Sequence, residues 1–87
     1  MPLSQYDLQK EIIRAKDIVE LHAAYRHYKS SDKTYIVKDI VINEADESPL
    51  VIYQAQYGEY ITFARPLNNW LDSVVLDGVA TARFIKL

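Results

Sequence analysis

Apolar positions in the first part of the chain recur with the spacing of an amphipathic helix. Ser4 followed by Asp7 is typical of a capped helix start, because the hydroxyl and the carboxylate can each satisfy a backbone N–H of the first turn. We therefore predict one helix over residues 4 to about 22, with His22 near its C-terminal end, where a positive charge favours the helix dipole. The predicted buried stripe comprises Leu8, Ile12, Ala15, Val19 and His22.

A second set of apolar residues on this helix, Tyr6, Ile13 and Leu21, lies off that stripe. Such a patch has two interpretations. It contacts a partner chain, which would give a homodimer through the N-terminal helix, or it lies beneath the rest of the domain.

From Tyr25 the pattern changes to alternation typical of strands. We predict a strand over Tyr25–Lys29 (YRHYK), a turn over Ser30–Lys33 and a strand over Thr34–Asn43. Both faces of the last strand are half apolar, which indicates a bulge or bend near Lys38-Asp39. An acidic loop over Glu44–Ser48 follows.

The clearest alternation lies in Leu50–Tyr57, where Val51, Tyr53, Ala55 and Tyr57 share one face. Gly58 and Glu59 are expected to turn the chain into a returning strand that ends at Pro66. Residues 67–71 are expected to form one helical turn that seats Trp70, and Asp77-Gly78 predicts a tight hairpin.

These elements predict an α+β protein, in which an N-terminal amphipathic helix precedes a small, mostly antiparallel, curled β-sheet or barrel. The chain of 87 residues is long enough for one domain. We divide this single globular unit into a helical extension over residues 1–24 and a β domain over residues 25–87.

Composition narrows the possible functions. Apolar residues make up 49% of the chain and charged residues 25%, as in a folded domain, and the chain has no cysteine for disulfides, thiolate chemistry or cysteine-bound zinc. The net charge of −2 is evenly spread, which does not favour a nucleic-acid binder driven by charge. The sequence shows neither a bilayer-spanning apolar run nor a signal peptide, so we expect a cytoplasmic protein that does not bind membranes.

Four motifs occur in an order that resembles a small bacterial family of unknown function, DUF1653: YRHYK at 25–29, VIYQAQYG at 51–58, ARPLNNWL at 64–71 and ARF at 82–84. The resemblance runs from Tyr25 to the C-terminus and leaves out the N-terminal helix. Ser30 and Glu59-Tyr60 stand where the family usually has glycines, so these turns are expected to differ in shape. The resemblance implies a compact β domain similar to an SH3-type barrel, and it implies no activity.

Arg65 is the single residue of most chemical interest, because it shares a strand face with Ile61 and Phe63 and its guanidinium then needs a partner. One interpretation is an anion clamp for a carboxylate or phosphate. The other, which we favour here, is an internal ion pair with an acidic residue. The acidic candidates are Glu44, Glu59 and Asp72.

Arg26, His27 and Lys29 form the densest basic cluster. They either recognise an anionic ligand or protect an edge strand from aggregation. An enzyme using His27 as acid or base is the weakest alternative, because no nucleophile or paired acid accompanies it, and we expect no metal or cofactor.

Aromatic residues are frequent in the β region, where they either fill a small core or line a binding groove. Our leading hypothesis is a non-enzymatic binding module for a peptide, a nucleic acid or a small anionic ligand; the alternative is an assembly protein that acts through the helix-mediated homodimer. The candidate ligand-binding residues are Arg26, His27, Lys29, Tyr53, Tyr57, Arg65 and Trp70.

Overall fold

The computed structural model describes residues 3–87 and begins with a capped helix, α1 (Gln5–Ile18). The Ser4 hydroxyl accepts a hydrogen bond from the Asp7 N–H at 3.1 Å, and the Asp7 carboxylate accepts one from the Ser4 N–H at 3.4 Å. The predicted N-terminal cap is therefore confirmed. The predicted end near residue 22 is wrong, because the helix stops at Ile18.

The early end of the helix follows from the packing of Val19 in the core. This residue is extended (φ −112°, ψ 114°) and its side chain is 1% exposed, so the chain leaves the helix to bury it. His22 follows in the left-handed region (φ 65°) and its N–H donates to the Val37 carbonyl at 2.8 Å. His22 is exposed and does not cap the helix, and Leu21 packs against the core rather than extending the exposed apolar patch.

The strands form one antiparallel five-stranded sheet in the order β4-β3-β2-β1-β7 and one separate hairpin, β5-β6. The sheet is curled and open, with β4 and β7 as its edges, so the predicted α+β class is confirmed and the closed-barrel alternative is not formed. The bounds are β1 (Ala24–His27), β2 (Ser30–Asn43), β3 (Ser48–Ala55), β4 (Thr62–Pro66), β5 (Ser73–Leu76), β6 (Val79–Ala82) and β7 (Phe84–Lys86).

Strand β2 contains the bulge that the sequence predicted. Val37 pairs with Tyr53 and Asp39 pairs with Ile52, which leaves Lys38 as the extra residue. The turn before this strand was predicted wrongly, because it lies at residues 28–29 and Ser30 already pairs with His27.

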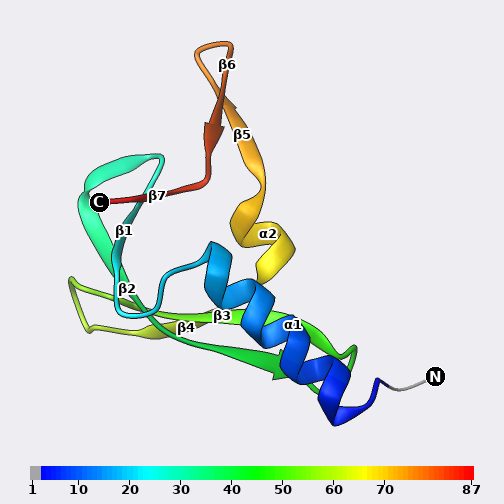
Figure 1. The fold of residues 1–87 in the computed structure, drawn as a ribbon. Coiled ribbons are helices and arrows are strands. Elements are labelled where there is room, and N and C mark those ends of the chain that lie inside the picture. Colours follow the sequence, from blue (N-terminus) through cyan, green and yellow to red (C-terminus); the bar gives the residue numbers. More distant parts are fainter. Residues whose placement is uncertain (1–2) are drawn as a thin grey trace.

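The core lies between the sheet, α1 and the short helix α2 (Leu67–Leu71) (Figure 1). The Trp70 ring is 3% exposed and stacks on the Phe84 ring at 3.8 Å. Ala15 and Val19 of α1 belong to the same cluster, so the helix covers its own sheet. None of the helices in residues 3–87 has the length and apolar content needed to cross a membrane.

The β5-β6 hairpin stands away from the rest of the molecule (Figure 1). Asp77 (φ 52°) and Gly78 (φ 79°) both occupy the left-handed region, as a type I′ turn requires, which confirms the predicted hairpin. Beyond β6 the chain passes through Arg83 and returns to the sheet, where β7 pairs with β1. This return places Phe84 opposite His27.

Candidate functional site

Arg65 of β4 is half-buried and is held by neutral partners. Its Nε donates to the Tyr53 hydroxyl at 3.2 Å and its Nη1 donates to the Asn69 Oδ1 at 2.6 Å. The guanidinium carbon lies 5.1 Å from the centre of the Phe84 ring, within the range of a cation–π contact. None of the acidic residues proposed as its ion-pair partner lies within 4 Å in residues 3–87, so that prediction is wrong.

Arg83 is a second arginine at the same place, and the candidate residues chosen from the sequence did not include it. Its Nε donates to the backbone carbonyl of Asn69 at 3.1 Å, while its own N–H donates to the Asp72 carbonyl at 3.3 Å. Asn69 thus holds two guanidinium groups, one through its side-chain oxygen and one through its backbone oxygen. The only signal for Arg83 was its place in the ARF motif.

His27 ends β1 beside these arginines. Its ring meets the Phe84 ring edge-on at 5.3 Å between centres, and its Nδ1 accepts a hydrogen bond from the Lys29 N–H at 3.4 Å. Burial lowers the pKa of His27 below its ordinary 6.5, and the positive charges of Arg65, Arg83 and Lys29 lower it further.

We call His27, Lys29, Arg65 and Arg83 the cationic cluster. The ion pairs within residues 3–87 join Arg14 to Glu11 and Lys86 to Glu20, so no member of the cluster has a carboxylate within 4 Å. Neutral hydrogen-bond partners hold the Arg65 and Arg83 side chains in place and leave their charge uncompensated.

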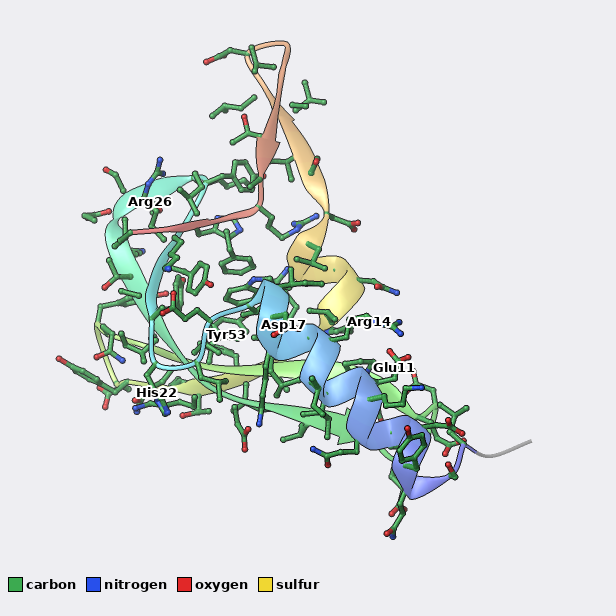
Figure 2. All side chains as sticks on the ribbon, viewed as in Figure 1. Glu11, Arg14, Asp17, His22, Arg26 and Tyr53 are labelled. Atoms are coloured by element: carbon green, nitrogen blue, oxygen red, sulfur yellow. The ribbon has the colours of Figure 1, made fainter. Side chains whose placement is uncertain are left out.

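Arg26 does not join this cluster, although it is next to His27 in sequence. Successive side chains of a strand point to opposite faces of the sheet, so Arg26 and His27 lie on opposite sides of β1. Figure 2 shows Arg26 at the outside of the molecule, well away from the buried Tyr53. The structure therefore divides the basic YRHYK segment between two surfaces.

The tyrosines do not form the open groove that we considered from the sequence. Tyr53 is 5% exposed and Trp70 is 3% exposed, so both belong to the core and support the site from beneath. Tyr57 is half-buried, and its hydroxyl lies 2.7 Å from that of Tyr35, a residue outside the sequence-based candidates. Burial, with the hydrogen bond to Tyr57, raises the pKa of Tyr35 to about 12.

The tyrosine pair gives a testable pH dependence. Because the pKa of Tyr35 is raised in the folded protein, its contribution to stability is present below pH 10 and is lost as the pH rises toward 12. We expect one of the seven tyrosines to ionise about two pH units late in a titration followed by tyrosinate absorbance. The variant Tyr57→Phe should shorten this delay without abolishing it, because the hydrogen bond is lost while the burial of Tyr35 remains. Tyr60→Phe, at an exposed position, should leave the delay unchanged. An ionisation as late in Tyr57→Phe as in the unaltered protein would contradict the assignment.

A helix packed on an open antiparallel sheet, with a second short helix and a separate hairpin, places this chain in the α+β class. Residues 23–86 match the family model described as Protein of unknown function (DUF1653), and the chain belongs to this family. The sequence-based resemblance is therefore confirmed.

A solved structure supports the fold. The chain is similar to the crystal structure of a DUF1653 protein from Bordetella bronchiseptica, with a TM-score of 0.66 and 22% identity over 75% of this chain and 83% of the other. No curated protein matches the sequence.

Proposed function

We propose that this protein is a small binding module that recognises an anionic group through the cationic cluster. The observation that carries the proposal is the pair of half-buried arginines, Arg65 and Arg83, which converge on Asn69 without a carboxylate partner in residues 3–87. Their guanidinium groups are oriented by hydrogen bonds that leave further N–H donors unused.

The energetics favour an external anion over a purely structural role. Partial burial costs a cation part of its hydration, and the neighbouring positive charges add repulsion. An arginine that only holds the fold together would be stabilised by a carboxylate of its own chain, and these arginines have none within 4 Å in the described residues. A bound anion would offset both costs.

The proposal is of a binding module and not of an enzyme. His27 donates no hydrogen bond to a serine or threonine within residues 3–87, and its Nδ1 accepts from the Lys29 backbone. The ring is therefore placed to add charge or polarity to an anion site, and we assign it no catalytic proton transfer.

The test is a proton–nitrogen NMR titration with sulfate at constant ionic strength, with the arginine Nε–H signals included. We expect a dissociation constant of about 1 mM, equivalent to about −4 kcal/mol, and shifts centred on Arg65, Arg83 and His27. Arg65→Gln or Arg83→Gln should each weaken binding roughly 10-fold or more, because a hydrogen bond to a charged group contributes about 1.5–3 kcal/mol.

The matched control is Arg26→Gln, which removes an equal charge from the opposite side of β1. It should change the affinity less than twofold, about 0.4 kcal/mol, because the removed charge is screened by solvent. Equal losses in all three variants would show unspecific attraction by net charge, and the proposed site would be wrong.

A further inference from the structure

The cationic cluster carries a more specific inference about its ligand, which rests on the proposed function. Arg65 and Arg83 are permanently charged, while His27 is the one member whose ordinary titration falls between about pH 5 and about pH 8. The site therefore has the fixed positive charges of the two arginines, a further fixed charge on the exposed Lys29 at its margin, and one ring, His27, that can gain a charge beside them.

We propose that the group bound here is the dianion of a phosphate ester, and that His27 takes up a proton when this group binds. A phosphate ester carries about −1.5 to −2 charges near neutral pH and presents three acceptor oxygens. That charge matches Arg65 and Arg83 together, whereas a single carboxylate would leave one of them uncompensated.

The arginine N–H groups that have no protein acceptor also favour a phosphate ester as the ligand. A guanidinium has five N–H groups in a planar fork. Arg83 gives only its Nε–H to the protein, and Arg65 gives its Nε–H and one Nη1–H. The N–H groups that remain on these two side chains are more numerous than the three oxygens of a phosphate ester.

The surroundings of His27 explain why protonation would follow binding. In the free protein its Nδ1 accepts the Lys29 N–H at 3.4 Å, so the neutral ring carries its proton on Nε2. The charges that act on the ring are cations from three segments: Arg65 on β4, Arg83 before β7 and Lys29 in the turn. The rings of Tyr28 and Phe84 complete its surroundings, at 4.6 and 5.3 Å between centres.

A bound dianion offsets most of the positive charge beside the ring. Without the anion, the cations oppose a proton on His27, so the pKa of His27 lies below 6.5. With the dianion, the charge beside the ring is neutralised and the pKa rises. By linkage, the anion must then bind more tightly as the pH falls through this range.

Sulfate is the appropriate probe because it remains a dianion throughout the range. We expect sulfate to bind roughly 10-fold more tightly at about pH 5 than at about pH 8, which corresponds to a rise of about one unit in the pKa of His27. The ring signals of His27 in the unaltered protein, with and without sulfate, measure that pKa directly. Methyl phosphate should shift the same signals, and acetate should bind at least about 10-fold more weakly at equal pH.

Two variants complete the experiment. At every pH, His27→Asn should bind sulfate with the weaker affinity that the unaltered protein shows at about pH 8. The control His22→Asn replaces the other histidine, which is exposed and has φ 65°, and it should keep the full pH dependence. Sulfate binding that does not change with pH, or acetate binding as tight as that of sulfate, would overturn this inference and leave the anion-binding module intact. If sulfate shifts neither arginine at any pH, both proposals fail together.

Discussion

Replacing Phe84 with alanine should cost about 3–5 kcal/mol of unfolding free energy, which is the usual cost for truncating a buried aromatic ring. Phe84 is 7% exposed, stacks on Trp70 at 3.8 Å and meets the Tyr53 and Tyr35 rings edge-on at 5.6 and 6.2 Å. A domain of this size has a total stability of roughly 5–10 kcal/mol, so the loss would be a large part of it. Urea unfolding followed by circular dichroism measures the effect, and the fluorescence of Trp70, the single tryptophan, should shift to the red as its ring meets water.

The control for this variant is Phe63→Ala. Phe63 is 40% exposed and lies 5.6 Å from the Tyr53 ring, at the margin of the same aromatic group. Its truncation should cost clearly less than that of Phe84, about 1–2 kcal/mol, because 40% of its surface already meets solvent. Similar losses at the two positions would show that Phe84 is not the centre of the packing.

The second large effect is expected on α1, where Ala15→Arg should destabilise the protein by about 3 kcal/mol or more. Ala15 is fully buried against the sheet, so a longer side chain overfills the contact and carries an unpaired charge into it. Thermal unfolding would report the loss, and the α1 amide signals should shift because the helix is displaced from β2 and β3.

Ile13→Arg is the matched control, since it introduces the same side chain on the outer surface of the same helix. Ile13 is 53% exposed, and we expect its substitution to change stability by no more than about 0.5 kcal/mol. Light scattering on both variants also addresses the homodimer hypothesis. A lower mass for Ile13→Arg than for the unaltered protein would assign the outer face of α1 to a partner chain.

The features predictable from the sequence are those fixed by local chemistry. The Ser4 and Asp7 cap, the bulge at Lys38 and the Asp77-Gly78 turn each depend on a few adjacent residues. The buried face of β3 also follows from alternation alone.

Tertiary packing decided the features that the sequence did not predict. The helix ends early because Val19 is drawn into the core, and the contact that receives it comes from distant strands. Arg65 lacks its expected acidic partner because α2 places the Asn69 amide, four residues further along the chain, within 2.6 Å of the guanidinium. Arg83 joins the site only because the chain returns from the hairpin to β1, a path that no local pattern indicates.

This return path also bears on the kinetics of folding. His27 lies near the start of the β region and Phe84 near its end, so the cluster forms only when β7, a three-residue edge strand, closes a long loop onto β1. Closing such a loop is entropically costly and tends to occur late, whereas the β2-β3 and β3-β4 hairpins rely on nearer contacts. Phe84 itself is buried in the core, so β7 is held in place once this loop has closed. The cationic cluster should therefore be among the last features to assemble.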